Sequence, residues 1–298
     1  MMSEVIKLHV CPLCKCTHAK EFHNMDSFGF KVTYYQCASC GFIFQDSNES
    51  QAAAPEFYEQ TYRRVYQDNE SPTPKDLDIQ QQRAEHTLSW LRNKGIKQLR
   101  NILDIGASAG VLLNQFRTVY GCGVSGVEPG KLYREFATTS GLKMYESLEE
   151  LKAFSLDRFD LVSLMHVLEH LTDPVMSLRD IRESFMTPDG YLLIEVPNFY
   201  AHDSYELAHL ACYTRHSLRQ LLAQSGFKLV ALRVHGFPRS NLLNLYLTVL
   251  ARPTSADEIG SKVKPERFVG LKRNLAMINR RMLQKVFSHK AWLPVKKD

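Results

Sequence analysis

The chain of 298 residues contains no run of eighteen or more apolar residues, so the sequence predicts no membrane-spanning helix. Its first residues also lack the apolar segment of a secretion signal, and a cysteine pair begins as early as Cys11. These two absences favour a cytoplasmic protein.

An excess of positive charge is also lacking over most of the chain. From Thr254 to the end there are 11 Lys and Arg against 4 Asp and Glu, whereas the rest has 26 against 28. An enzyme that acts on nucleic acid normally carries its positive charge on the folded domain. We therefore expect no nucleic-acid partner and a basic C-terminal tail.

Glycine is missing where a dinucleotide-binding turn would need it. An apolar run at residues 102–105 ends in Gly106 and Gly110, and a helical pattern follows, which predicts a buried strand, a tight turn and a helix. The dinucleotide pattern requires glycines at 106, 108 and 111, but this chain has Ser108 and Val111. A dinucleotide site is therefore disfavoured.

The same turn resembles the first motif of class I S-adenosylmethionine-dependent methyltransferases, acid-x-Gly-x-Gly-x-Gly, with Ser108 at the middle glycine. A second strand pattern ends at Glu128, where a carboxylate can accept both ribose hydroxyl hydrogens. The resemblance implies an α/β fold with a Rossmann-like sheet of seven strands and S-adenosylmethionine as cofactor. The cofactor-binding residues expected from it are Asp104, Gly106, Ser108, Gly110, Glu128 and His166.

Five of the seven cysteines lie within the first forty residues, and four of them form the Cys-x-x-Cys pairs Cys11/Cys14 and Cys37/Cys40. This spacing suits one tetrahedral Zn²⁺ and favours a structural zinc ribbon, with a strand at residues 28–35, over a redox role for either pair. Cys122 and Cys212 are isolated, and we expect them to be buried. The layout resembles the zinc-binding N-terminal domain of bacterial C-methyltransferase-like proteins, which implies a nucleotide-linked sugar or a related polar metabolite as substrate.

Histidines follow the fourth predicted strand, at residues 159–164. The next segment, residues 165–174, resembles that of small-molecule methyltransferases, including those of ubiquinone biosynthesis, and lacks the Asn/Asp-Pro-Pro-aromatic motif of enzymes that methylate nucleobase amino groups. His166, Glu169 and His170 are spaced to share one helical turn. They could bind a divalent metal, supply a general base or orient loops by hydrogen bonding. His166 and His170 are therefore catalytic candidates.

The first catalytic candidate is His209. Together with Tyr213, Thr214 and the later Gly226-Phe227, it resembles the family's pattern in the loop that faces the substrate. A neutral imidazole there could take a proton or anchor the substrate, and the alternative is that His209 caps the next helix or bonds its own loop. The elements expected around it are a turn at residues 186–190 and strands at residues 191–196, 227–234 and 242–250.

We expect four segments along the chain. They are a zinc ribbon (residues 1–45), a linker with N-terminal helices (46–100), a methyltransferase core (101–253) and a basic amphipathic tail (254–298). In the second segment, Tyr58, Tyr62 and Tyr66 share a helical face that either packs on the core or covers the cofactor as a lid.

Helical spacing in the tail gives one apolar stripe, and three interpretations of it remain open: packing on the core, binding of a protein partner or second copy, and binding to a membrane surface. The stripe comprises Leu271, Leu275, Ile278, Met282 and Val286.

The function predicted from these features is methyl transfer from S-adenosylmethionine to the oxygen or carbon of a small polar metabolite, such as a sugar or surface-polysaccharide precursor. Two other functions remain open. One is a protein that binds S-adenosylmethionine without catalysis, for interaction or regulation. The other is a ribosomal-RNA methyltransferase, which would need a basic groove joining ribbon and core.

Overall fold

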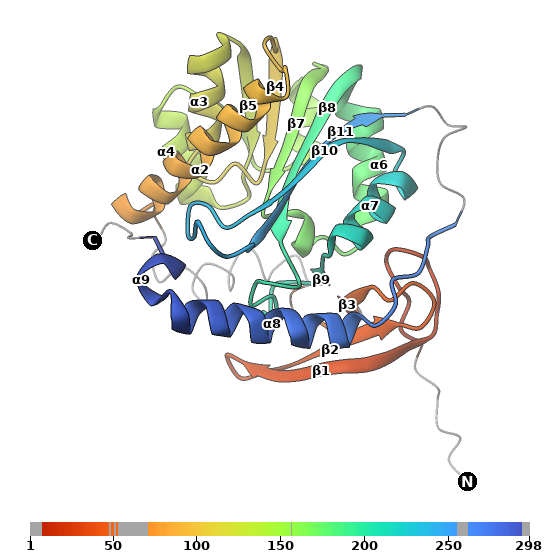
Figure 1. Cartoon of the computed structure of the whole chain (residues 1–298). Helices are drawn as coiled ribbons and strands as arrows, with labels where there is room; N and C mark the ends of the chain where they lie inside the picture. The colour runs from red at the N-terminus through yellow and green to blue at the C-terminus, as the bar shows by residue number, and fades with distance from the viewer. Residues whose placement is uncertain are drawn as a thin grey trace.

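The computed structural model describes residues 8–47, 49–50, 52, 71–155, 157–254 and 262–293. Its main feature is a seven-stranded sheet with the order β10-β11-β8-β7-β4-β5-β6 (Figure 1). The strands are β4 (Asn101–Ile105), β5 (Gly123–Val127), β6 (Lys143–Tyr145), β7 (Phe159–Met165), β8 (Met186–Pro197), β10 (Phe227–His235) and β11 (Tyr246–Pro253).

Five of these strands, from β6 to β8 across the sheet, run parallel, and β11 pairs antiparallel with both β8 and β10. The chain order reverses at β4, since β5 lies on one side of this strand and β7 on the other. Ligands of open α/β sheets bind at the carboxyl ends of the strands where the order reverses. The predicted Rossmann-like sheet is confirmed, with its closing antiparallel hairpin.

Helices cover both faces of the sheet (Figure 1). Apolar residues of α2, α3 and α4 form one buried cluster with the sheet, and those of α5, α6 and α7 belong to another. The helices are α2 (Pro74–Asn93), α3 (Val111–Tyr120), α4 (Lys131–Thr139), α5 (Leu148–Phe154), the 3₁₀ helix η3 (Leu168–His170), α6 (Pro174–Phe185), α7 (Arg215–Gln224), α8 (Val269–Val286) and α9 (Ser288–Ala291). None of the helices in the described part of the chain is long and apolar enough to cross a bilayer.

Two strand boundaries differ from those predicted. Residues 186–190, expected as a turn, belong to β8, where Phe159 pairs with Met186 and Leu161 already pairs with Tyr191. The proline and glycine of that segment therefore form an irregularity within the strand pairing instead of a turn before it. The last strand begins at Tyr246 and not at residue 242.

A second sheet, with the order β1-β2-β3-β9, includes Cys37, and the other three paired cysteines lie just outside its strands. Its strands are β1 (Ala19–Ser27), β2 (Phe30–Cys37), β3 (Ile43–Gln45) and β9 (Ala211–Cys212). The sequence predicted one strand between the cysteine pairs, but two are present, joined by Phe28 and Gly29, whose positive φ angles (53° and 83°) suit a two-residue hairpin turn. Because β9 comes from the loop after β8, this sheet includes residues on both sides of the proposed boundary at residue 45.

The C-terminal helix α8 packs on the loop after β8 and on the second sheet (Figure 1). Arg273 donates to the carbonyl oxygens of Phe199 and His202, and Arg280 donates to that of Ala201. Both arginine side chains are buried, so this face of the helix is packed on the folded protein. Its apolar stripe, in contrast, faces solvent, and each of its five members is between 55% and 62% exposed.

Candidate functional site

The glycine turn, residues 106–110, follows β4 at the carboxyl edge of the sheet. Gly106 and Gly110 both have positive φ angles (72° and 73°), which favour glycine. A Cβ atom at Gly106 would overlap the side chain of Val167, and one at Gly110 would overlap Leu142. Glycine is therefore required at both positions, and Gly110 also begins α3 as its N-cap.

Ser108 replaces the middle glycine of the motif and still adopts the left-handed conformation, with φ of 50°. That conformation costs a non-glycine residue roughly 1–2 kcal/mol. The backbone N–H of Ser108 donates to Oε2 of Glu128 at 2.9 Å, and Gln80 donates to its hydroxyl at 3.4 Å. These contacts offset the strain, so serine is compatible with the turn.

Glu128 lies one residue beyond β5 and is 6% exposed. Its two carboxylate oxygens accept hydrogen bonds from the backbone N–H groups of Ser108 and Gly130, the second at 2.8 Å. The carboxylate is therefore held in a fixed orientation across the glycine turn. This is where the ribose-binding acid was predicted.

A cavity of about 470 Å³ opens between the glycine turn, α2 and the segment after β7. Of the six predicted cofactor-binding residues, five line it, and Gly110, the last residue of the turn, does not. Gln80, Arg83 and Ala84 of α2 also line the cavity and were not predicted. Their i, i+3, i+4 spacing was the available signal. The lining residues are Gln80, Arg83, Ala84, Asp104, Ile105, Gly106, Ala107, Ser108, Leu112, Val127, Glu128, Pro129, Gly130, Met165, His166, Val167, His170 and Leu171.

Asp104 is the acid at the start of the motif, and it is 3% exposed. The Ser163 hydroxyl donates to it at 2.6 Å. Burial raises the pKa of Asp104 to about 7, against the lowering effect of this hydrogen bond, and the charge of Glu128 adds to the rise. The carboxyl group of Asp104 therefore titrates near neutral pH. Its position in β4 and its hydrogen bond with Ser163 hold it in place.

Glu195 of β8 is fully buried behind the cavity, and three basic side chains lie close to its carboxylate. Its Oε1 lies 3.3 Å from Arg83 Nε and 3.3 Å from His166 Nε2, and its Oε2 lies 3.2 Å from His235 Nε2. The Thr248 hydroxyl donates to Oε2 at 2.8 Å. Burial acts to raise the pKa of Glu195, but His166, His235 and Arg83 hold it well below its usual value. Glu195 was not predicted as a site residue, although it is the only acid in the largely apolar run at residues 191–196 of this strand.

His166 follows β7, with a left-handed φ of 59°. Its Nδ1 lies 3.3 Å from Glu169 Oε1 and its Nε2 lies 3.3 Å from Glu195 Oε1. Burial and Arg83 act to lower the pKa of His166, but the two carboxylates outweigh them and raise it above 6.5. Because both ring nitrogens face carboxylates, this geometry favours a binding role for His166 over a role as base.

His170 lies in η3 and lines the cavity. Its Nδ1 lies 2.8 Å from the carbonyl oxygen of Ala208, which can only accept a hydrogen bond. In the neutral ring Nδ1 therefore carries the hydrogen and Nε2 carries the lone pair. Burial lowers the pKa of His170 to about 4, although the charge of Glu169 acts to raise it, so the ring is neutral at pH 7.

His209 is 7% exposed and is not among the cavity-lining residues of the described chain. Its Nδ1 lies 3.2 Å from the carbonyl oxygen of Ser204, and its Nε2 lies 3.6 Å from Glu206 Oε2. Its ring centre is 5.1 Å from that of His170. The structure thus places His209 behind His170, within its own loop, and its role as the base stays a prediction.

The predicted histidine cluster is assembled differently from the single helical turn that its spacing suggested. His166 lies before η3, and His209 takes its place, since single ligand atoms of Glu169, His170 and His209 lie within 4.8 Å of one another. Burial acts to raise the pKa of Glu169, but His166 lowers it to about 2. Glu169 is therefore ionised at neutral pH, and its Oε1 lies 3.3 Å from His166 Nδ1.

The four predicted zinc ligands lie together beside the second sheet, in which Cys37 is the last residue of β2. The Sγ atoms of Cys11, Cys14, Cys37 and Cys40 are all within 4.8 Å of one another. Those of Cys11 and Cys40 are 3.7 Å apart, and those of Cys14 and Cys37 are 3.5 Å apart. Zinc–sulfur bonds of about 2.3 Å in a tetrahedron place the sulfur atoms about 3.8 Å apart. The geometry therefore fits a Zn(Cys)₄ site.

Other predictions have separate outcomes. Cys122 and Cys212 are buried, as predicted. The tyrosine face at Tyr58, Tyr62 and Tyr66 lies outside the described residues.

Comparison with known proteins gives the same assignment as the glycine turn. Residues 76–232 match the family model described as "Methyltransferase domain". The chain is 28% identical over 130 residues to the ubiquinone biosynthesis O-methyltransferase of Haemophilus ducreyi, covering 38% of this chain and 54% of that protein. It is 32% identical over 119 residues to the enzyme of the same name from Aeromonas salmonicida, covering 37% and 49%. The chain thus spans about half the length of the curated relatives it matches.

Solved structures with a similar fold include magnesium protoporphyrin IX methyltransferase from Synechocystis with bound S-adenosylmethionine, with a TM-score of 0.47 and 16% identity over 67% of this chain and 94% of that one. Another is an S-adenosylmethionine-dependent methyltransferase from Archaeoglobus fulgidus, with a TM-score of 0.47 and 19% identity over 60% of this chain and 100% of that one.

The family match includes β4, the glycine turn, Glu128 and the segment after β7. It extends over 157 of the 298 residues, which is more than half of the chain. The chain therefore belongs to the methyltransferase-domain family, and its sheet is that of the class I S-adenosylmethionine-dependent methyltransferases that the glycine turn predicts.

Proposed function

We propose that this protein transfers the methyl group of S-adenosylmethionine to a hydroxyl oxygen of a small metabolite. The observation that supports this most is that one cavity is lined by the glycine turn, the fixed carboxylate of Glu128 and the neutral ring of His170. The first two would hold the cofactor, and the third would take the proton that the hydroxyl loses. Because the sulfonium already activates the methyl group, alignment and proton removal are what the protein must supply.

In this proposal each cavity residue has a separate task. Glu128 accepts hydrogen bonds from the ribose, and the guanidinium of Arg83, with His166 beside it, attracts the carboxylate of the methionine portion. The acceptor oxygen attacks the methyl carbon as the carbon–sulfur bond breaks, which leaves S-adenosylhomocysteine. The hydroxyl proton passes to Nε2 of His170, and the negative charge of Glu169 favours the imidazolium that forms.

The curated relatives described above are named O-methyltransferases of ubiquinone biosynthesis, which supports oxygen over carbon as the acceptor atom. Neither is named for a sugar, so the sugar or polysaccharide precursor expected from the cysteine module stays a prediction. A cofactor-binding protein without catalysis would keep Glu128 and the glycine turn, but it would have no need for His170 as a base.

Binding of S-adenosylmethionine tests the first step. Glu128→Ala is expected to weaken affinity at least tenfold, because each hydrogen bond to a charged group contributes roughly 1.5–3 kcal/mol. Isothermal titration calorimetry measures the change. Glu135→Ala is the matched control, since its side chain is exposed on α4 and lies outside the cavity lining. Equal affinities for the two variants would reject Glu128 as the ribose acid.

We infer that the four clustered cysteines hold one structural zinc ion. Elemental analysis is expected to give about one zinc per chain, and Cys37→Ser is expected to lower this below about one third. Cys16→Ser is the matched control, because Cys16 lies in the same segment but outside the four-sulfur cluster. Full zinc content in Cys37→Ser, or none in the unmodified protein, would contradict the site.

A further inference from the structure

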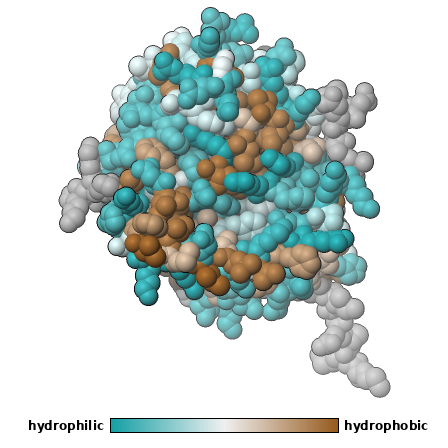
Figure 2. Space-filling view, in the orientation of Figure 1, coloured by the Kyte–Doolittle hydropathy of each residue, from teal (hydrophilic) through white to brown (hydrophobic). Residues whose placement is uncertain are grey.

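The outer face of α8 is apolar and exposed, although the helix is firmly held by its inner face. Its apolar stripe, defined above, runs along the helix, and further large apolar side chains are exposed at its ends (Figure 2). Phe268 is 74% exposed just before the helix, and Phe287 and Trp292 are 41% and 44% exposed after it. The aromatic residues that an interfacial helix uses as anchors are therefore present at both ends.

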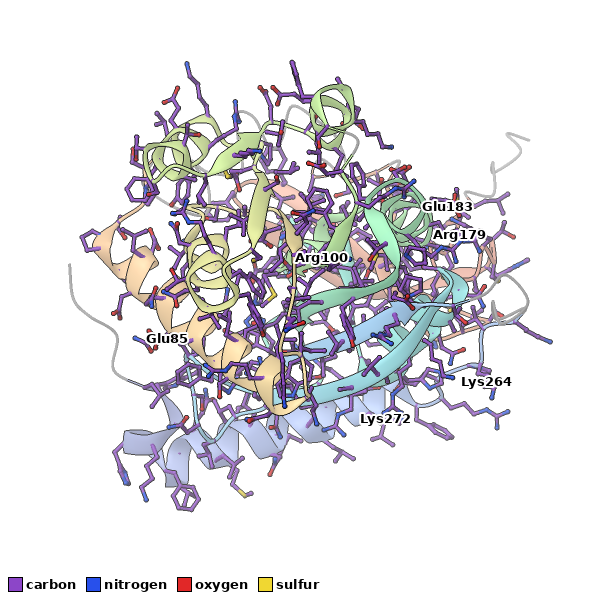
Figure 3. All side chains as sticks on the ribbon, turned by 90° about the horizontal axis from the view of Figure 1, so that it is seen from above. Glu85, Arg100, Arg179, Glu183, Lys264 and Lys272 are labelled. Atoms are coloured by element: carbon purple, nitrogen blue, oxygen red, sulfur yellow. The ribbon has the colours of Figure 1, made fainter. Side chains whose placement is uncertain are left out.

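Charge on this helix has one sign. From Val269 to Val286 it contains five Lys and Arg residues and no Asp or Glu. With about 100° between successive residues, Lys272 and Lys285 fall roughly 60–80° to either side of the stripe. Lys272 and the preceding Lys264 lie near the start of the helix (Figure 3), where both side chains are exposed. The apolar stripe therefore has cations along both of its edges.

The inner face lies opposite the stripe and fixes how the helix is presented. Arg273 and Arg280 are held by the carbonyl oxygens of the loop after β8, and Arg280 also pairs with Asp203 at 2.8 Å. The helix cannot turn its stripe inward without breaking these buried contacts. The stripe is therefore a permanent surface of the folded protein.

We propose that α8 is a membrane-docking helix that lies in the headgroup region of an anionic lipid surface, with its apolar stripe toward the acyl chains. Lysines on both edges would reach the anionic headgroups, and the aromatic side chains would occupy the interface at each end. A second copy of the chain is a poorer occupant, because two such helices, which contain no acid, would bring like charges together. Glu266, just before the helix, pairs with Lys272 at 3.2 Å and offsets one of these charges. The proposal concerns binding alone and does not depend on methyl transfer.

The test uses the full-length protein and vesicles of two compositions, neutral phosphatidylcholine alone and phosphatidylcholine with about a third phosphatidylglycerol. Co-sedimentation is expected to show at least tenfold stronger binding to the anionic vesicles, weakening as salt is added. Leu275→Glu/Ile278→Glu is expected to abolish this binding. The matched control is Phe154→Glu/Met176→Glu, which changes two exposed apolar residues of α5 and α6 in the same way and should bind as the unmodified protein does.

Trp292 provides a second readout. In a Trp90→Phe background it is the sole tryptophan, and its emission is expected to shift to the blue on anionic vesicles. Thermal melts and cofactor binding establish that every variant is folded. Equal binding by the two double variants, or no binding to anionic vesicles, would overturn the proposal. So would a concentration-dependent dimer that Leu275→Glu/Ile278→Glu alone dissociates, since a second copy would then occupy the stripe.

Discussion

Replacing His170 with asparagine is expected to lower turnover by roughly a hundredfold or more, the usual contribution of a general base. The Asn amide can still donate to the Ala208 carbonyl, as Nδ1 of the histidine does, but it has no nitrogen lone pair in the position of Nε2. Affinity for S-adenosylmethionine is expected to stay within about threefold, because the variant removes no cationic partner of the cofactor. Steady-state kinetics with an accepted substrate and calorimetry measure the two effects.

The pH profile separates the base from a structural role. The pKa of His170 is lowered to about 4, so turnover of the unmodified enzyme is expected to fall as the pH drops through that value and the ring becomes protonated. The asparagine variant should lack this acid limb. His209→Ala is the comparison variant, because His209 contacts its own loop outside the cavity. A hundredfold loss in His209→Ala together with normal turnover in His170→Asn would make His209 the base. Loss of activity after metal chelation, at normal zinc content, would instead point to a metal at Glu169, His170 and His209.

Glu195→Ala is expected to lower the free energy of unfolding by about 3–5 kcal/mol at neutral pH, since it leaves buried cationic groups without their carboxylate. In this variant Arg83 Nε and His166 Nε2 both lose their contact with Glu195 Oε1, and the Thr248 hydroxyl loses the carboxylate oxygen to which it donates. Urea denaturation followed by circular dichroism measures the change. Glu183→Ala is the control, because it removes an exposed ion pair with Arg182 and is expected to cost less than about 1 kcal/mol.

The stability difference between the unmodified protein and Glu195→Ala is expected to depend on pH in both directions. The folded-state pKa of Glu195 lies well below 4.5, so its contribution is present above pH 4.5 and is lost as the pH falls through the folded-state value. The folded-state pKa of His166 lies above 6.5, so the contribution of its charge is present below pH 6.5 and is lost as the pH rises through that value. The difference should therefore be widest between pH 4.5 and pH 6.5. A difference that is constant from pH 4 to pH 9 would contradict this ionic network.

The strands of the core could be predicted because each is short, apolar and followed by a turn signal. The glycine turn and Glu128 could be placed because their chemistry depends on local backbone conformation, which nearby residues determine. Gln80 and Arg83 were missed because they come from α2, about 25 residues before the turn. Their approach to the cavity depends on how that helix packs on the sheet.

The orientation of α8 could not be predicted for a different reason. Its periodicity correctly indicated an amphipathic helix, but the usual expectation is that the apolar side packs inward. Here Arg273 and Arg280 occupy the inner side, because unpaired carbonyl groups of the loop at residues 199–202 need donors. The need of these carbonyl groups for hydrogen-bond donors arises from the tertiary fold, so it cannot be read from the local sequence.

Because β3 pairs with β9, the zinc ribbon cannot be replaced independently of the loop after β8. The Tyr34 hydroxyl donates to the carbonyl oxygen of Glu206 at 2.7 Å, and the Gln45 amide donates to that of His209 at 2.9 Å, so two strands of the module grip the backbone of the loop beside the cavity. A homologous zinc ribbon grafted in its place would have to reproduce both of these hydrogen bonds as well as the fold of the ribbon. The zinc ribbon and the loop after β8 are therefore expected to evolve together, because a change in one must be matched by a change in the other.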